Sequence, residues 1–200
     1  CNDVFNQIAR DEKARDIRAS FLLAGAMLGR FGKAVMPMPG GCSIGLRPVD
    51  LHLKGFTSLG AECNIEQGMV NIEAKELKGN DVYLDFPSVG ATENIMLAGV
   101  LAKGETTISN CAIEPEIVDL AKFLNSIGAK ISGAGTDTIV IKGVNELGGC
   151  CHRVIPDRIE AGTFMIAVAG TGGNVKIQDV IPEQLRPVIS KLKEADVEVK

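Results

Sequence analysis

The apolar positions of residues 117–127 recur at helical spacing, so this stretch predicts an amphipathic helix with one buried face. The stripe consists of Ile117, Val118, Leu120, Ala121, Phe123, Leu124 and Ile127. Gly128 follows and predicts a left-handed helix end, because glycine adopts a positive φ without steric cost. Residues 136–142 then alternate as a strand should. Residues 95–101, by contrast, are apolar nearly all round, so we expect a helix enclosed on most sides.

A pattern of two halves recurs three times along the chain. The first half is a helix rich in small and apolar residues that runs into a β-like segment, at 17–36, 89–110 and 158–179. The second half is an amphipathic helix that ends at a glycine or polar break and leads to a strand. Ala19, Ala91 and Ala161 align at intervals of about 70 residues. Each copy predicts helix, strand, helix, strand, strand, and three copies predict a pseudo-symmetric α/β domain of helices enclosed by sheets.

The third copy begins at "RVIPDRIE", residues 153–160. Asp157 can cap the helix that follows, and Glu160 stands three residues later, as in a capping box. The preceding "NELGGCCHR" is polar and glycine-rich, which is typical of a connection. We therefore expect a domain boundary near 153–157, and a third copy that the end of the chain cuts short.

The composition narrows the class of protein. The chain has 200 residues, is 46% hydrophobic and carries a net charge of −4, which allows a sizeable core. The net charge is negative with the two signs interspersed, and there is one Tyr and no Trp. The chain therefore lacks the basic stripe with aromatic platforms that nucleic-acid binding favours. The apolar runs are too short for a membrane span and the first residues lack a signal-peptide core, so we expect a cytoplasmic protein without membrane contact.

The cysteines and histidines predict no metal site. Six cysteines show no CxxC pair, and two histidines give no zinc-ligand spacing. Reduced thiols are the simplest interpretation, and Cys150 and Cys151 receive no role. The chain opens on "CNDV" without an initiator Met, and we expect it to be a fragment.

Cys42 stands in the glycine-rich stretch "PGGCSIGLRPVD", residues 39–50, and has two interpretations. A free cysteine usually behaves as a small hydrophobe in a core. The glycines around it leave no side chains to pack against, which indicates an exposed thiol whose pKa Arg47 could tune. The local sequence leaves both open.

Three further features are equally ambiguous. Arg47 precedes Pro48 on a stiff extended backbone, and could be a solvated arginine before a helix that Asp50 caps, or a donor to a phosphorylated or carboxylated ligand. Arg18 has the same two interpretations. The helix start in residues 85–94, with Ser88 as N-cap, offers unpaired N–H groups to an anion, although most helix starts bind nothing.

The remaining polar residues favour structural interpretations. Glu114, Glu116 and Asp119 form an acidic cluster ahead of a helix, where negative charge is favourable, although paired carboxylates could also serve acid–base chemistry. His52 and His152 are lone histidines, and we expect both to be structural.

Five stretches occur in one order along the chain: "RASFLLAGAMLGRFG", "PGGCSIGLRPVDLHL", "PSVGATENIMLA", "EPEIVDLAKFLNSIGAKISGAGTDTIVIKGV" and "RVIPDRIEAGTF". Together they resemble the bacterial UDP-N-acetylglucosamine enolpyruvyl transferases. The resemblance implies an inside-out α/β barrel-like fold in two domains of three repeated units each, with the active site between them. Residues 1–155 would be two of the three units of the first domain, and 156–200 the truncated start of the second.

The resemblance also implies a reaction. The family transfers the enolpyruvyl group of phosphoenolpyruvate to the 3-hydroxyl of UDP-N-acetylglucosamine and releases phosphate, the first committed step of peptidoglycan synthesis. Addition and elimination of this kind need a proton donor for the C3 methylene, a base for the sugar hydroxyl and cations for two anionic substrates. No cofactor and no metal are implied, and we expect the isolated chain to be inactive.

Roles are implied for matching residues. Cys42 matches the proton donor, which can form an adduct with phosphoenolpyruvate, and Arg47 and Arg18 match substrate-binding arginines. The nucleotide-sugar contacts match the backbone of Arg47, Pro48, Val49, Asp50 and Leu51, and the helix start at Phe86, Pro87, Ser88 and Val89. Many members carry Lys-Val in place of Phe86-Pro87, so a charged phosphate contact is lost there while backbone contacts can remain. Asp157 and Glu160 fall near the hinge between the family's domains.

Two alternatives remain. The sister family, 5-enolpyruvylshikimate-3-phosphate synthase, shares the fold and phosphoenolpyruvate, but it lacks the loop cysteine and binds no nucleotide. A non-catalytic paralogue that only binds a UDP-sugar would have no need of an exposed thiol. The stretch around Cys42 therefore argues against both.

Overall fold

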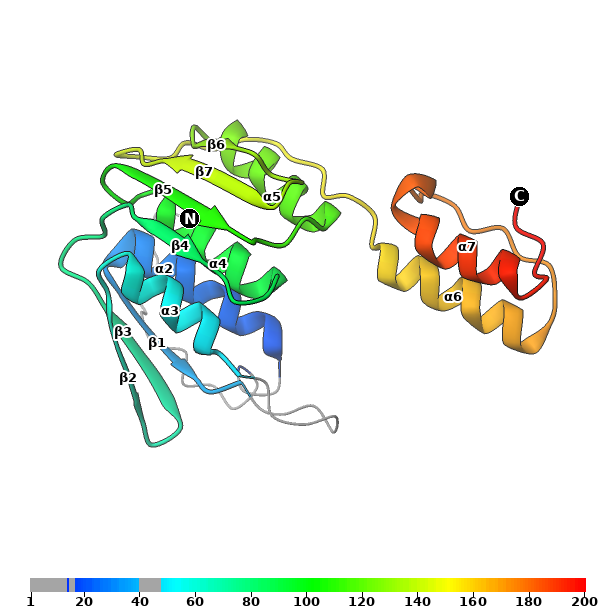
Figure 1. Cartoon of the computed structure of the whole chain (residues 1–200), viewed down its shortest axis with the longest axis horizontal. Helices are drawn as coiled ribbons and strands as arrows, with labels where there is room; N and C mark the ends of the chain where they lie inside the picture. The colour runs from blue at the N-terminus through cyan, green and yellow to red at the C-terminus, as the bar shows by residue number, and fades with distance from the viewer. Residues whose placement is uncertain (1–13, 15–16, 40–47) are drawn as a thin grey trace. The chain divides into compact units, whose positions relative to one another are not determined.

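The computed structural model describes residues 14, 17–39 and 48–200 of the chain, shown in Figure 1. Its contacts divide the chain into two compact units, Cys1–His152 and Arg153–Lys200. Each unit is described by itself.

The first copy of the repeat builds one layer of the first unit. Its elements are η1 (Arg18–Leu22), α2 (Leu23–Phe31), β1 (Lys33–Pro37), α3 (Asp50–Ser58), β2 (Glu62–Glu66) and β3 (Met69–Glu73). The strands form an antiparallel sheet in the order β1-β3-β2, in which Met36 of β1 lies opposite Val70 of β3. The helices and strands alternate in the predicted order.

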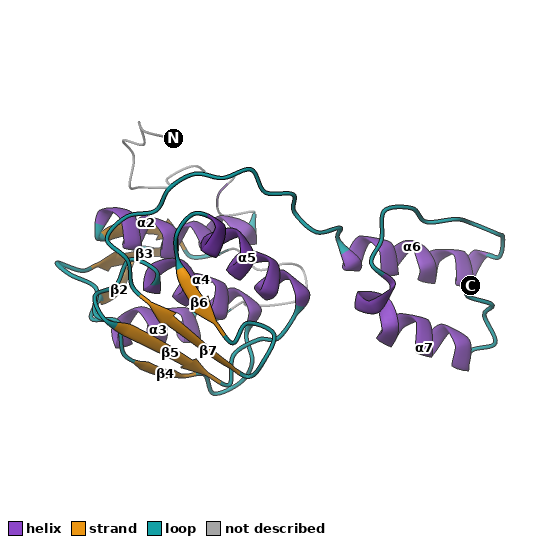
Figure 2. Cartoon of the chain, turned by 90° about the horizontal axis from the view of Figure 1, so that it is seen from above, coloured by secondary structure: helices purple, strands orange, loops and turns teal. Residues whose placement is uncertain are grey.

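The second copy repeats that order after one additional strand. Its elements are β4 (Asp81–Tyr83), α4 (Val89–Gly99), β5 (Glu105–Ser109), α5 (Pro115–Ser126), β6 (Lys130–Ser132) and β7 (Thr138–Lys142). Figure 2 shows the four strands side by side, in the order β4-β5-β7-β6. β4 and β5 run parallel because α4 carries the chain back between them, whereas the other pairs are antiparallel. Neither sheet closes on itself.

Several predictions of local structure are confirmed. The amphipathic stretch at 117–127 lies in α5, and Gly128 after it has a φ of 108°. The alternating stretch at 136–142 contains β7, whose Ile139 and Ile141 are buried. The apolar stretch at 95–101 begins within α4 and is buried on nearly every side.

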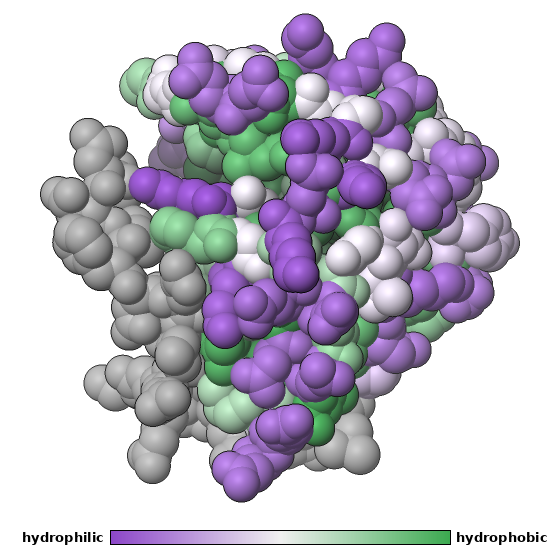
Figure 3. Space-filling view, turned by 90° about the vertical axis from the view of Figure 1, so that its left-hand side faces the viewer, coloured by the Kyte–Doolittle hydropathy of each residue, from purple (hydrophilic) through white to green (hydrophobic). Residues whose placement is uncertain are grey.

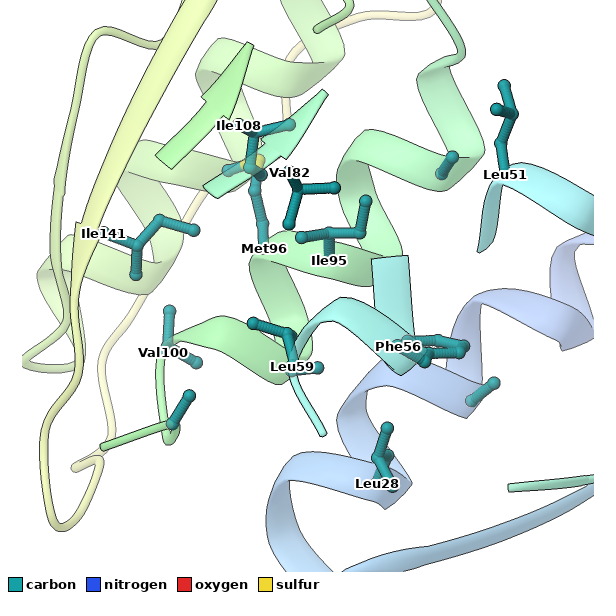
Figure 4. Packing of buried hydrophobic residues seen from close by; sticks show 14 of the residues in the cluster. Leu28, Leu51, Phe56, Leu59, Val82, Ile95, Met96, Val100, Ile108 and Ile141 are labelled. Atoms are coloured by element: carbon teal, nitrogen blue, oxygen red, sulfur yellow. The ribbon is translucent and has the colours of Figure 1, made fainter. Parts of the chain in front are cut away.

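The core of the first unit is organised around α4, which packs against α2, α3 and α5. Figure 4 shows how Ile95 and Met96 of α4 lie among apolar side chains from the other elements, which include Leu28, Phe56, Leu59, Val82, Ile108 and Ile141. The small residues of the repeat have a packing reason here. A Cβ at Gly25 of α2 would overlap the backbone oxygen of Asn94 in α4, so only glycine lets the two helices approach this closely.

The second unit holds the start of the third copy. Its elements are α6 (Arg158–Thr171), η2 (Pro182–Leu185) and α7 (Arg186–Glu194), which contact one another. The predicted cap is confirmed, because Asp157 Oδ1 accepts hydrogen bonds from the backbone N–H groups of Ile159 at 2.7 Å and Glu160 at 3.2 Å.

The β-like segment predicted at the end of 158–179 is wrong. Residues 172–181 form no helix and no strand. In the first two copies, this strand pairs with the last strand of its own copy, β1 with β3 and β5 with β7. Residues 195–200 supply no such partner, and a strand without a neighbour leaves its backbone N–H and C=O groups unpaired.

Hydrophilic side chains dominate the face shown in Figure 3, and apolar ones show mainly in the recesses between them. None of the helices that the structure describes is long and apolar enough to cross a membrane.

Candidate functional site

A pocket of about 310 Å³ opens where η1 and the starts of α3 and α4 meet. Its lining residues are Arg18, Ala19, Phe21, Leu22, Pro39, Pro48, Val49, His52, Val89, Gly90 and Glu93. The helix starts of the first two copies both contribute, Arg18 and Ala19 from η1 and Val89 and Gly90 from α4. Four of the predicted site residues, Arg18, Pro48, Val49 and Val89, therefore meet around one cavity although they are far apart in the sequence.

Arg18 supplies positive charge to this pocket. It is the first residue of η1, is exposed to solvent, and forms no ion pair with a described residue. Its charge acts on His52 nearby, whose pKa it helps to lower. A guanidinium at a cavity wall is suited to an anionic ligand.

The start of α4 supplies backbone donors. Ser88 is the N-cap, as predicted, and its Oγ accepts a hydrogen bond from the backbone N–H of Ala91 at 3.4 Å. The N–H groups of Val89 and Gly90, both at the pocket, donate no hydrogen bond to a described residue. Unpaired N–H groups at the positive end of a helix are suited to an anion.

The other predicted residues of this region lie outside the lining. Phe86 and Pro87 are exposed, and Leu51 is buried in the core. The prediction that Asp50 caps a helix is wrong, because Asp50 is already the first residue of α3 and Val49 precedes it as N-cap. Its carboxylate instead stands in the first turn, where the helix dipole favours negative charge.

Cys42 and Arg47 lie outside the described residues. The nearest described neighbours of that segment, Pro39 and Pro48, both line the pocket.

His52 is buried in the first turn of α3, at the pocket, and its ring contacts a residue on each of two sides. Its ring packs edge-on against Phe21, with 5.2 Å between the ring centroids. Its Nδ1 lies 2.8 Å from Nδ2 of Asn94. Burial above all, and then the charge of Arg18, lowers the pKa of His52 to about 4, while Asp50 acts in the opposite direction. The ring is therefore neutral at pH 7.

Glu93 also lines the pocket, and sequence analysis did not single it out. Burial, and then the negative charge of Glu116, raises the pKa of Glu93 to about 7. Glu93 follows Val89 and Gly90 by four and three residues, and residues at this spacing share a helix face. This spacing could have indicated that Glu93 lies at the same site.

The remaining polar residues form no second site in the part of the chain that the structure describes. No three His, Cys, Asp or Glu side chains there could hold a metal ion together. His152 has a structural partner, because its Nε2 lies 3.2 Å from Oδ1 of Asp119. Cys150 is exposed and lies 3.0 Å from the hydroxyl of Ser126, and Glu114 precedes α5 as its N-cap.

Solved structures identify the class of fold. The chain superposes on the enolpyruvyl transferase NikO from Streptomyces tendae with a TM-score of 0.69 at 24% sequence identity, over 92% of this chain and 45% of that one. It superposes on the EPSP synthase from Acinetobacter baumannii with a TM-score of 0.65 at 29% identity, over 88% of this chain and 40% of that one. The predicted fold class is confirmed: this is the enolpyruvyl transferase fold, with repeated helix and strand units and open sheets.

Sequence comparison then identifies the family. The family model of EPSP synthase (3-phosphoshikimate 1-carboxyvinyltransferase) matches residues 3–200, and the chain belongs to this family. It is 60% identical over 197 residues to UDP-N-acetylglucosamine 1-carboxyvinyltransferase 1 of Caldanaerobacter subterraneus subsp. tengcongensis, covering 98% of this chain and 48% of the relative. It is 56% identical over 198 residues to UDP-N-acetylglucosamine 1-carboxyvinyltransferase 2 of Clostridium tetani, covering 99% of this chain and 48% of the relative. The chain thus spans about half the length of the curated relatives it matches.

Proposed function

We propose that the chain is part of a UDP-N-acetylglucosamine 1-carboxyvinyltransferase, which transfers the enolpyruvyl group of phosphoenolpyruvate to the 3-hydroxyl of UDP-N-acetylglucosamine and releases phosphate. The observation that carries the proposal is the difference in identity within one family. Relatives that bear this name are 55–60% identical to the chain, whereas the EPSP synthase from Acinetobacter baumannii is 29% identical. An enzyme of this kind acts in peptidoglycan synthesis, and hence in cell-wall biogenesis, cell shape and cell division, in the cytoplasm.

The pocket supports this proposal because it suits the anionic part of a nucleotide sugar. Arg18 lines the same cavity as Val89 and Gly90, whose N–H groups donate to no described residue. Phosphate oxygens prefer donors of this kind. The backbone from Arg47 to Leu51 and the helix start from Phe86 to Val89 are the proposed nucleotide-sugar contacts, with backbone contacts replacing a lysine at Phe86.

The chemistry is assigned to residues of the sequence between Pro39 and Pro48, which both line this pocket. Cys42 is the proposed proton donor to C3 of phosphoenolpyruvate, and Arg47 the cation beside it. The sugar hydroxyl oxygen then bonds to C2 while its proton passes to a base, and loss of phosphate from C2 and of a proton from C3 restores the double bond. Residues 1–155 are the proposed two repeat units of the first domain, and residues 156–200 the proposed start of the second domain.

Two measurements test the proposal on this chain. Fosfomycin, an epoxide that mimics phosphoenolpyruvate, should add covalent mass to the peptide that contains Cys42, and leave the other five cysteines unmodified. Modification of all six cysteines alike would contradict the assignment of Cys42. In NMR titrations, UDP-N-acetylglucosamine should shift the amides of Val89 and Gly90, whereas shikimate 3-phosphate should not. The reverse result would favour the EPSP synthase activity.

A further inference from the structure

The side chain of Asn94 lies inside the backbone hydrogen bonding of another helix. At the junction of η1 and α2, an α-helical bond would run from the N–H of Gly25 to the carbonyl of Phe21, four residues earlier. Asn94 takes the place of this bond. Its Oδ1 accepts the N–H of Gly25 at 2.7 Å, and its Nδ2 donates to the carbonyl of Phe21 at 3.2 Å.

These two backbone partners fix the orientation of the amide. A carboxamide flipped by 180° would place its NH₂ against an N–H group and its oxygen against a carbonyl, so only one orientation of Asn94 satisfies both. Asn94 is fully buried, and an unpaired polar group there would carry a desolvation cost of about 1–3 kcal/mol. Because one N–H of Nδ2 points to the carbonyl of Phe21, the direction of the second N–H is also fixed.

That second N–H meets His52. Nδ2 of Asn94 lies 2.8 Å from Nδ1 of His52, and since Nδ2 can only donate, Nδ1 must accept with its lone pair. In a neutral imidazole the single proton then resides on Nε2. Nε2 makes no hydrogen bond with a described residue, and it lies beside Gly90, at 3.5 Å from the position that a Cβ there would occupy.

We propose that Asn94 is a positioning residue that holds His52 as the neutral tautomer with its proton on Nε2, and so presents His52 to the pocket as a hydrogen-bond donor for the anionic ligand. The choice of ligand rests on the proposed function, whereas the tautomer rests on the amide geometry alone. His52 would add a directed neutral donor between the charge of Arg18 and the N–H groups of α4. The charged groups that act on the ring are Arg18 and Asp50.

The tautomer is tested by long-range ¹H–¹⁵N correlation spectra of the ¹⁵N-labelled chain at pH 7. The chain has two histidines, and His152→Gln assigns the signals by removing one of them. We expect Nδ1 of His52 in the unprotonated range and Nε2 in the protonated range in the wild type. A protonated Nδ1 in the wild type would overturn the proposal without any variant being needed.

The role of Asn94 is tested by two substitutions. Asn94→Ala removes the donor, so the two neutral tautomers of His52 should mix, and Asn94→Asp substitutes an acceptor that should draw a proton to Nδ1. Asn125→Asp and Asn125→Ala are the matched controls, because Asn125 binds both backbone groups of Ile131, at 2.8 and 2.9 Å, and forms no hydrogen bond with a histidine among the described residues. An unchanged His52 signal in both folded Asn94 variants would overturn the proposal.

Titration with UDP-N-acetylglucosamine tests ligand binding by His52 separately from its tautomer. We expect ligand to shift Nε2 of His52, and Asn94→Ala to weaken binding roughly tenfold or more, as for the loss of a hydrogen bond to a charged group. Equal affinity of Asn94→Ala and wild type would overturn the role of Asn94 in binding. If the wild type shows the Nε2 proton but binds no UDP-N-acetylglucosamine, the proposed function fails at this pocket and the positioning of His52 by Asn94 stands.

Discussion

Helices α4 and α6 open corresponding copies of the repeat, yet one is enclosed and the other is not. With Ala91 aligned on Ala161, Met96 of α4 corresponds to Ile166 of α6. Met96 is fully buried, whereas Ile166 is 58% exposed. The two sequences are similarly apolar, so the difference comes from their neighbours: α4 packs against three helices and lies next to a sheet, while α6 contacts only η2 and α7 in its own unit. The repeat therefore specifies a helix, and the following strands decide whether its apolar face is buried.

The largest expected effect separates these two positions. Met96→Ala should lower the free energy of unfolding of the first unit by about 2–5 kcal/mol, because it removes buried contacts and leaves a cavity. Ile166→Ala should change the stability of the second unit by about 0.5 kcal/mol or less. Hydrogen exchange measured by mass spectrometry in a urea series reports each unit through its own peptides. Equal losses at both positions would show that α6 is as enclosed as α4 in solution.

The copies of the repeat also show which elements the sequence could predict. The helical stripe at 117–127, the alternation at 136–142 and the all-apolar helix at 95–101 depend on local patterns, and all three were found. The strand in the third copy was not, because a strand depends on a partner elsewhere in the chain rather than on its own alternation.

The candidate site divides in the same way. Arg18, Val49 and Val89 were found through motifs, and the structure places them at one pocket. Glu93 was missed because its unusual environment comes from burial beside a second helix. Asn94 was missed because its partners lie more than 40 residues away in the sequence, in η1, α2 and α3. The roles of Cys42 and Arg47, and the assignment of residues 1–155 and 156–200 to two domains, stay predictions.

Gly25 of α2, which packs against α4, and Gly162 of α6 should respond in opposite directions to substitution by alanine. Gly25→Ala places a methyl group against the backbone of Asn94, and overpacking of this kind costs about 1–3 kcal/mol. At Gly162 in α6 the nearest atom to such a methyl group would be 3.5 Å away, an ordinary contact, so Gly162→Ala should stabilise its unit by about 0.5–1 kcal/mol through helix propensity. Urea unfolding followed by circular dichroism and hydrogen exchange measures both. A stabilising Gly25→Ala would contradict the close approach of α2 and α4.

The helix caps give a smaller contrast. Asp157→Ala removes the acceptor of two N–H groups and should cost the second unit about 1 kcal/mol, with faster hydrogen exchange in the first turn of α6. Ser88→Ala removes one bond of 3.4 Å and should cost the first unit less. Asp157→Asn keeps the acceptor and is the control, so a loss in that variant as large as in Asp157→Ala would point to charge rather than to capping.

The smallest expected net effect is a pH dependence at the pocket of the first unit, because two opposite contributions largely cancel there. The pKa of Glu93 is raised from 4.5 to about 7, so the folded state holds this proton more tightly than the unfolded state does, and stability is lost as the pH rises from about 4.5 to about 7. The pKa of His52 is lowered from 6.5 to about 4, so its contribution is lost as the pH falls from about 6.5 to about 4. The two dependences oppose each other between pH 4.5 and 6.5, and that of Glu93 alone remains up to about pH 7. Glu93→Gln should therefore flatten the decline in stability from pH 6.5 to 7 and leave a steeper loss on the acid side, in urea midpoints measured at half-unit pH steps. An identical pH profile in Glu93→Gln and wild type would show that Glu93 is better solvated than its place in the pocket wall indicates.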